Sequence, residues 1–403
     1  MGIFVLETLG TVADMATDKI SVSKLTAETY ISTENMLPEK GGIERAIKLP
    51  SSGNVNLFLP GDVLFSNIRT YFKKVWMARM TGGASADVVI FRAKDNEKID
   101  SHYLYYVLSS DAFIESTVTA SKGTKMPRGD KDAMRRFKFP LPPLPDQHRI
   151  AGILSAYDEL IENSQRRIKI LEAMARGLYR EWFVHFRFPG HENHPRVASS
   201  LGEIPEGWDV KAIKDFGKAI TGKTPSKTNA DFFGDDVPFI KTPDMHGNIF
   251  VLDTNESLSI VGAKLQSNKT LPVGSICVSC IGTIGVVSIT TEECQTNQQI
   301  NSVVLAKNEY REFLFFRLQE ARQALENLGS NGATMGNVNK SKFESMEVVA
   351  PTELLLMDFH RLTQPLFKSI FFLTRQINNL RRTRDLLLPR LLSGQIEIQS
   401  EVA

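Results

Sequence analysis

The chain has 403 residues, of which 42% are hydrophobic and 23% are charged, and its formal net charge is +2. These values predict a folded protein with more than one core and argue against a disordered chain. The near-neutral charge neither requires nor excludes a polyanionic partner, because a local basic stripe can lie within a balanced total. No apolar run reaches the roughly 20 residues of a membrane-spanning helix. The three cysteines imply no disulfide framework, so we expect a cytoplasmic protein.

Residues 1–144 are predicted to form a mixed α/β unit. Short runs such as DVLFSNI and ADVVIFRA are typical of strands, and DSHYLYYVLSSDAFIEST predicts an amphipathic helix. A basic loop, KGTKMPRGDKDAMRRFK, runs from Lys122 to Lys138 with seven Lys or Arg against two Asp. Such a charge run is most often a solvated face. Here Gly123 and Gly129 would let the backbone come close to a ligand.

A long helix is predicted at residues 145–187, after the proline-rich run PLPPLPDQ. Its apolar residues recur at alternating steps of four and three, which is the seam of a coiled coil. The seam positions are Ile150, Leu154, Tyr157, Ile161, Ile168, Leu171, Ala175, Leu178 and Trp182.

Residues 188–207 are rich in Pro, Gly, His and Ser and predict a linker. The nearby His185, His191 and His194 have no cysteine beside them and no helix to hold them, which argues against a metal site.

Residues 208–350 predict a second mixed α/β unit, with strands in SICVSCI and INSVVLA and a helix in YREFLFFRLQEARQALENL. A second long helix follows at residues 351–394, and residues 395–403 form a tail. Its seam positions are Leu366, Ile370, Leu373, Ile377, Leu380, Leu387 and Leu391. Pro365 is expected to end or kink the first turns of this helix, because proline lacks the N–H that the helix needs.

The two halves of the chain are related by an offset of 209 residues. YISTENM from Tyr30 matches FIKTPDM from Phe239, GTKMPR from Gly123 matches GATMGN from Gly332, and both helices carry the seam in the same register. The period is far too long for a solenoid repeat. We therefore expect an α+β fold in which two mixed α/β domains are separated by two long helices. The helices would form an antiparallel coiled coil with pseudo-two-fold symmetry.

Matching loops of the two units carry different polar residues, which suggests two readers of DNA sequence. Arginine reads guanine and asparagine reads adenine in the major groove, while lysine contacts phosphate. The candidate DNA contacts of the first unit are Asn67, Arg69, Lys122, Lys125, Arg128, Arg135 and Arg136. Those of the second unit are Lys223, Thr224, Ser226, Lys227, Asn331, Asn337, Asn339 and Lys340.

Two other functions stay open at this point. GKAITGKT, from Gly217 to Thr224, fits the phosphate-loop pattern of an NTPase, but its flanks predict neither a strong strand before it nor a helix after it. A coiled-coil scaffold without a DNA role is the other alternative. The pair Cys277 and Cys280 has no second pair to complete a zinc site, so buried thiols are expected. We find no catalytic motif.

The run FPLPPLPDQHRIAGILSAYDELIENSQRRIKILEAMARGLYREWF is very similar to the central conserved region of specificity subunits of type I restriction–modification enzymes. LTRQINNLRRTRDLLLPRLLSGQIEI resembles their C-terminal conserved region, and the order of parts agrees along the whole chain. The resemblance implies that residues 1–144 and 208–350 are target-recognition domains. It also implies a non-catalytic chain that binds double-stranded DNA at a bipartite target, with one half-site per domain and a spacer set by the helices.

The resemblance further implies the partners. Two modification (methyltransferase) subunits would bind S-adenosylmethionine, and restriction (motor-nuclease) subunits would join them, so that S-adenosylmethionine, ATP and Mg belong to the partners and this chain binds no cofactor. We expect the partners to bind exposed faces of the helices. The side chains expected on these faces are Arg166, Arg167, Lys169, Glu172, Arg176, Arg381, Arg382 and Arg384.

Overall fold

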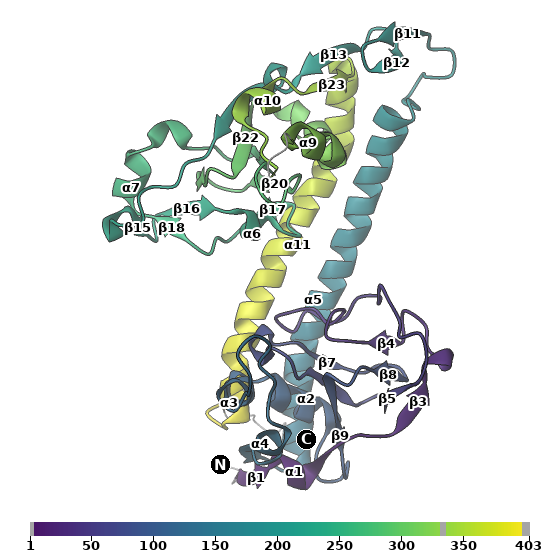
Figure 1. Cartoon of the computed structure of the whole chain (residues 1–403), viewed down its shortest axis with the longest axis vertical. Helices are drawn as coiled ribbons and strands as arrows, with labels where there is room; N and C mark the ends of the chain where they lie inside the picture. The colour runs from purple at the N-terminus through teal and green to yellow at the C-terminus, as the bar shows by residue number, and fades with distance from the viewer. Residues whose placement is uncertain (1–3, 331–335, 397–403) are drawn as a thin grey trace, which may run out of the picture. The chain divides into compact units, whose positions relative to one another are not determined.

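The computed structural model describes residues 4–330 and 336–396. Contacts divide the chain into two compact units: unit 1 holds residues 1–162 and 378–403, and unit 2 holds residues 163–377. Two long helices run through both units (Figure 1). They are α5 (Leu144–Tyr179), which continues into a π-helical turn (Arg180–Val184), and α11 (Glu353–Leu392).

Unit 1 is built from two small sheets with short helices around them. One sheet has the strand order β2-β9-β6-β7, the other has the order β3-β5-β8-β4, and β1 pairs with β10. The strands are β1 (Val5–Thr8), β2 (Ala13–Met15), β3 (Lys19–Ser21), β4 (Tyr30–Ile31), β5 (Asn54–Phe58), β6 (Val63–Ser66), β7 (Val75–Met77), β8 (Gly82–Ala84), β9 (Val88–Ala93) and β10 (Lys138–Leu141). The helices are α1 (Leu9–Val12), α2 (Ser101–Ser109), α3 (Asp111–Thr119) and α4 (Lys131–Arg135).

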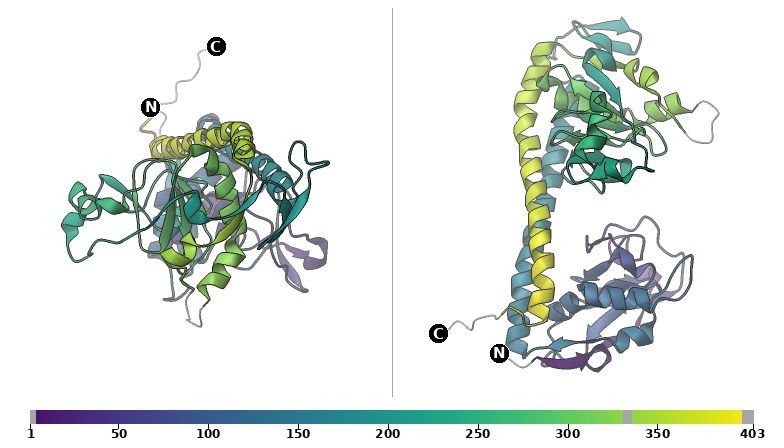
Figure 2. Two further views of the ribbon diagram at one scale, coloured as in Figure 1. Left: turned by 90° about the horizontal axis from the view of Figure 1, so that it is seen from above. Right: turned by 90° about the vertical axis from the view of Figure 1, so that its left-hand side faces the viewer.

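The core of unit 1 lies between the sheet β2-β9-β6-β7 and both long helices. Buried residues of β6 and α2 pack with Ile150 and Leu154 from the start of α5 and with Leu388 and Leu391 from the end of α11. Within this unit the beginning of one helix therefore lies beside the end of the other, as the right-hand view of Figure 2 shows. Such a pairing is antiparallel.

Unit 2 repeats this plan with one more strand in its main sheet. The sheet orders are β14-β22-β19-β20-β17 and β15-β18-β16-β21, and β13 pairs with β23. The strands are β13 (Asp209–Ala212), β14 (Gly217–Thr221), β15 (Phe233–Gly234), β16 (Val237–Ile240), β17 (Phe250–Val251), β18 (Ser257–Leu258), β19 (Ile276–Ser279), β20 (Val287–Thr290), β21 (Gln295–Thr296), β22 (Ile300–Leu305) and β23 (Glu347–Ala350). The helices are α6 (Thr242–Met245), α7 (Ile260–Lys264), α8 (Arg311–Glu320), α9 (Arg322–Gly329) and α10 (Lys340–Glu344).

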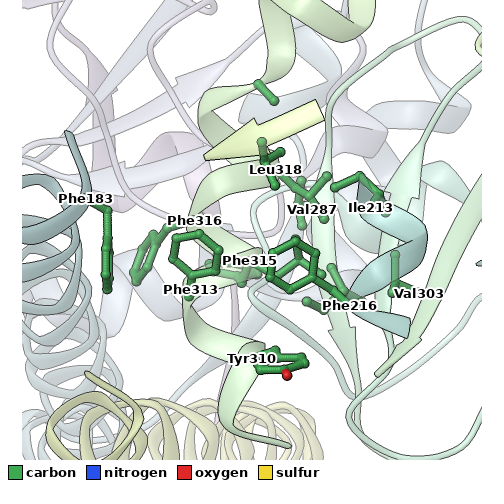
Figure 3. Close-up of a cluster of buried hydrophobic side chains, with 14 of the residues drawn as sticks. Phe183, Ile213, Phe216, Val287, Val303, Tyr310, Phe313, Phe315, Phe316 and Leu318 are labelled. Atoms are coloured by element: carbon green, nitrogen blue, oxygen red, sulfur yellow. The ribbon is translucent and has the colours of Figure 1, made fainter. Parts of the chain in front are cut away.

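An aromatic cluster forms the core of unit 2 (Figure 3). Phe183 lies 4.9 Å from Phe313 of α8 and 4.8 Å from Phe359 of α11, between ring centroids, in edge-to-face geometry. Edge-to-face pairs add about 0.5–1.5 kcal/mol each beyond the area they bury. Here the end of α5 packs with the start of α11, so the helices also run antiparallel within unit 2.

The predicted duplication is present in the strand pairing. In unit 1, β4 pairs in parallel with β8, with Tyr30 opposite Gly83. In unit 2, β16 pairs in parallel with β21, with Phe239 opposite Gln295. The α+β class, the two mixed units and the two long helices are confirmed, while the pseudo-two-fold relation between the units stays a prediction.

Two local expectations were wrong. DSHYLYYVLSSDAFIEST forms two helices, because the Ser110 side chain accepts a hydrogen bond from the Phe113 N–H and caps a new helix. The corresponding run in unit 2 also divides, into α8 and α9. The linker also holds an element that was not predicted, an antiparallel hairpin of β11 (Arg196–Ser199) and β12 (Gly202–Pro205).

Pro365 neither ends nor visibly breaks α11, which continues for 40 residues from Glu353 to Leu392. The proline lies on the exposed face of the helix, where water can satisfy the carbonyl that loses its partner. Packing of the opposite face, which includes buried Thr363 and Phe367, holds the helix through this position.

The seam positions of both helices are all buried or half-buried. Four of the expected surface residues are not fully exposed: Glu172, Arg176 and Arg381 are half-buried, and Arg384 is buried at 7% accessibility. Its guanidinium pairs with Asp158 of α5 at 2.5 Å and with Asp385 at 2.9 Å. Arg384 therefore joins the two helices within unit 1 and is not free to serve a partner subunit.

Candidate nucleic-acid interface

The basic loop of unit 1 is a closed turn held against the end of β6. Lys122 and Arg128 exchange two backbone hydrogen bonds of 2.9 Å, and Arg128 also forms a β-bridge with Ile68. The Arg69 N–H donates to the Pro127 carbonyl at 2.9 Å, and the Arg69 guanidinium donates to the Lys125 carbonyl at 3.4 Å. The structure thus brings Arg69, Lys122, Lys125 and Arg128 together as exposed cations on one surface.

Carboxylates neutralise part of this surface. The Lys122 ammonium lies 2.6 Å from Asp130, and the Arg128 guanidinium lies 2.9 Å from Asp87. The hydrogen bond from Lys122, with backbone N–H groups of Ala133 and Asp132, lowers the pKa of Asp130 to about 2. Lys125 has no ion pair within the described ranges, so its charge is available to a phosphate.

The other three candidates of unit 1 occupy different places. Asn67 is buried at 8% exposure beneath Gly129, whose N–H donates to the Asn67 carbonyl, so Asn67 supports the loop from below. Arg135 and Arg136 are exposed at the end of α4, where Arg135 pairs with Asp132 at 3.0 Å.

Unit 2 holds its asparagines on the matching backbone. Ile281 forms a β-bridge with Asn337, as Ile68 does with Arg128, and the Val338 N–H donates to the Cys280 carbonyl. Asn337 is exposed. Asn339 caps α10 by accepting from the Lys342 N–H at 3.0 Å, and Lys340 pairs with Glu344 at 3.1 Å. Asn331 lies outside the described residues.

The stretch from Gly217 to Thr224 does not form a phosphate loop. Gly217 lies on strand β14, and no helix begins at Thr224. The Gly222 and Lys223 N–H groups donate to the carbonyls of Ile300 and Thr296, so they are not free for phosphate. A Cβ at Gly222 would lie 2.2 Å from atoms of Thr296 and Asn297, which explains the glycine by close packing of two chain segments.

Lys223, Thr224, Ser226 and Lys227 instead form a surface loop that leaves the sheet beside the Asn337 loop. Asn301 of β22 joins the two loops: its Oδ1 accepts from the Thr221 hydroxyl at 2.6 Å, and its Nδ2 donates to the Val338 carbonyl at 2.9 Å. Sequence reasoning missed this positioning residue. The signal was one asparagine inside the apolar strand run INSVVLA.

The family model described as "Type I restriction modification DNA specificity domain" matches residues 53–173 and 205–353. The chain belongs to this family. Among curated proteins it is 33% identical to the type I restriction enzyme HindI specificity subunit of Haemophilus influenzae, over 73% of this chain and 77% of that protein. It is 25% identical to the putative type I restriction enzyme MjaX specificity subunit of Methanocaldococcus jannaschii, over 97% and 91%.

A solved structure supports the fold of this specificity subunit. The crystal structure of a type I restriction–modification system S subunit from M. genitalium aligns with a TM-score of 0.60, at 14% identity, over 99% of this chain and 97% of that one. The family makes the chain a specificity component rather than a catalytic one.

The cysteines carry no metal or redox site that the structure shows. All three are buried, and burial raises the pKa of Cys277 to about 12 and of Cys280 to about 11. Within residues 4–330 and 336–396, no cluster of His, Cys, Asp and Glu could hold a metal. In the same ranges, no helix is both long and apolar enough to cross a membrane.

Proposed function

We propose that this specificity subunit binds a bipartite DNA target, with one half-site for each unit. The observation that carries the proposal is the matched position of Arg128 and Asn337. Both residues pair with an isoleucine that follows the equivalent strand, β6 in unit 1 and β19 in unit 2. Arginine favours guanine and asparagine favours adenine. Two related scaffolds that present different side chains at one position would read different bases.

The remaining candidate residues would serve as phosphate contacts and supports. Lys125, Lys223 and Lys227 are exposed lysines at the rims of the two loops, where they would bind the DNA backbone. Lys122 and Lys340 would do so in competition with their carboxylate partners. Asn67 would hold its loop through its main-chain carbonyl, which accepts from the Gly129 N–H, and Asn339 would hold its loop by capping α10.

The helices would set the spacer between the half-sites. At 1.5 Å per residue, the 36 residues of α5 and the 40 residues of α11 are about 54–60 Å long. One turn of DNA is about 34–36 Å, so a helix of this length corresponds to roughly one and a half turns.

The partners in this proposal are two modification subunits and the restriction subunits, in a cytoplasmic complex. S-adenosylmethionine, ATP and Mg would bind to those subunits. Exposed apolar side chains on the long helices, including Ile170, Met174 and Phe372, support a helix surface that binds protein.

Methylome sequencing tests the proposal directly. A host that carries this chain with its modification subunits should methylate one split motif, two specified segments separated by unspecified bases. A continuous motif would contradict one half-site per unit. Loss of the motif when this chain alone is deleted is the necessary control.

A further inference from the structure

Two aromatic rings are exposed beside the basic loop of unit 1. Tyr71 and Phe72 lie on the 3-10 turn η2 (Thr70–Phe72), directly after Arg69, and are 47% and 40% exposed. Their ring centroids are 4.8 Å apart. The Tyr71 hydroxyl makes no hydrogen bond within the described part of the chain. Neither ring contributes to the buried clusters of unit 1.

The turn that carries the rings is strained and clamped. Five non-glycine residues have positive φ in the described chain, and four of them are Glu39, Lys40, Arg69 and Lys73. Arg69 and Lys73 flank η2. The Glu39 and Lys40 N–H groups donate to the carbonyls of Phe72 and Lys73, both at 2.9 Å. Such strain costs about 1–3 kcal/mol per residue and persists only where surrounding contacts enforce it.

Ion pairs hold the clamp in place on both sides. Lys73 binds Asp111 of α3 at 2.8 Å, and Lys40 binds Asp385 of α11 at 3.4 Å. The turn is therefore fixed in a conformation that leaves both rings partly exposed to solvent. Burying the two rings would stabilise the fold. The exposed rings therefore contribute less to the stability of the turn than buried rings would.

The surroundings of the rings fit DNA better than protein. Arg69 and Lys125 lie next to the turn, and neither has an ion pair in the described ranges. Exposed apolar side chains bordered by cations without ion pairs suit a duplex DNA groove, where rings contact sugars and base edges and cations bind phosphates.

Unit 2 has no such pair on its matching loop. There Ile281 is followed by Gly282, Thr283 and Ile284, and the Ile284 side chain is buried at 5% exposure. The duplication thus offers an internal comparison: the backbone bridge is shared, while the aromatic turn belongs to unit 1.

We infer that Tyr71 and Phe72 form an aromatic platform that packs against deoxyriboses and base edges of the half-site bound by unit 1. This inference rests on the proposed function. The rings would make contacts with DNA in addition to those of the loop cations. These contacts would depend on the apolar surface of the rings and not on charge.

The test uses the full chain assembled with its modification subunits and the split target from the methylome. The double variant Tyr71→Ser/Phe72→Ser should bind the cognate duplex about fivefold to 150-fold more weakly, as expected for the loss of apolar ring surface buried against DNA. The slope of log affinity against log salt should stay the same, because no phosphate contact is lost. The single variants Tyr71→Trp and Phe72→Tyr, which keep an aromatic ring, should keep wild-type affinity. The single variant Tyr71→Leu, which removes the ring, should not.

Leu59→Ser is the matched control, since Leu59 is an exposed apolar side chain of unit 1 at the opposite end of β6. Equal cognate affinity of the double variant and wild type would overturn the platform, while the proposed function would stand. Failure of the wild-type complex to prefer its target would instead refute the proposed function. Loss of assembly with the modification subunits at unchanged folding would show that the rings bind protein, and would also overturn the inference.

Discussion

Asp130 determines how much of the charge of Lys122 is available to DNA. It caps α4 through Oδ1 and binds Lys122 through Oδ2, whereas unit 2 has Asn339 in the same capping role. The pKa of Asp130 is lower in the folded chain than the usual value of about 3.9. Its carboxylate therefore stabilises the loop fully at pH values above about 3.9, and this stabilisation is lost as the pH falls towards about 2. At neutral pH the pair is therefore fully charged.

The substitution Asp130→Asn should keep the cap and release Lys122. We expect tighter DNA binding and a salt slope steeper by about one, which is the contribution of one additional phosphate contact. Fluorescence anisotropy over a salt series measures both. Glu28→Gln, which releases Arg45 from a pair at 2.9 Å in the same unit, is the control for a change of one charge, because neither residue is a candidate DNA contact. An unchanged slope for Asp130→Asn would place Lys122 away from DNA.

The buried thiols give a test of the unit 2 core. Burial raises the pKa of Cys277, Cys280 and Cys294, so each stays a neutral thiol when folded. Ellman's reagent at pH 8 should modify none of them in the native chain and all three in denaturant. In the unfolded state these thiols ionise near pH 8.5, so the stability of unit 2 should decrease as pH rises above that value. Rapid labelling of the native chain would contradict this core.

Elements with strong periodicity were the most predictable from sequence. The two helices were expected at 145–187 and 351–394, and α5 with its π turn and α11 lie within two residues of three of these four limits. The strands β6, β9, β19 and β22 were also expected, because short alternating stretches are typical of strands. The break between α2 and α3 at Ser110 was missed. A serine can cap a helix or lie inside one, and tertiary packing decides which of the two occurs.

The candidate site was less predictable, because its members meet through tertiary contacts. GTKMPR indicated the loop, but only the fold brings Ile68 beside Arg128 and places Asn67 beneath Gly129. The aromatic platform escaped sequence reasoning because Tyr71 and Phe72 resemble core residues. Their exposure depends on a turn held by distant Glu39 and Lys40.

Pro365 offers a prediction at the level of the helix. Proline inside a helix is about 3 kcal/mol less favourable than alanine. Part of this cost is offset, because proline also lowers the conformational entropy of the unfolded chain. Because Pro365 is exposed within a continuous α11, Pro365→Ala should raise the free energy of unfolding by about 1–3 kcal/mol. Urea denaturation measures it, and Pro389→Ala, on the exposed face of the same helix, provides the comparison. A loss of stability would show that the proline ring makes a needed contact.

At the scale of the whole molecule, duplication is the central property of the chain. The parallel pairs β4–β8 and β16–β21, the capped helices α4 and α10, and the bridges at Arg128 and Asn337 recur in both units. What differs between the units is surface chemistry, with cations and rings in unit 1 and amides in unit 2. A duplicated scaffold with diverged surfaces fits a reader of two unlike half-sites.

The most direct test compares Arg128→Ala with Asn337→Ala, two variants at matched positions. Each full complex would be titrated with the cognate duplex and with duplexes altered in one half-site. Arg128→Ala should lose about fivefold to 150-fold of the discrimination at one half-site only, and Asn337→Ala should lose it at the other only. Equal loss at both half-sites in either variant would contradict two independent readers.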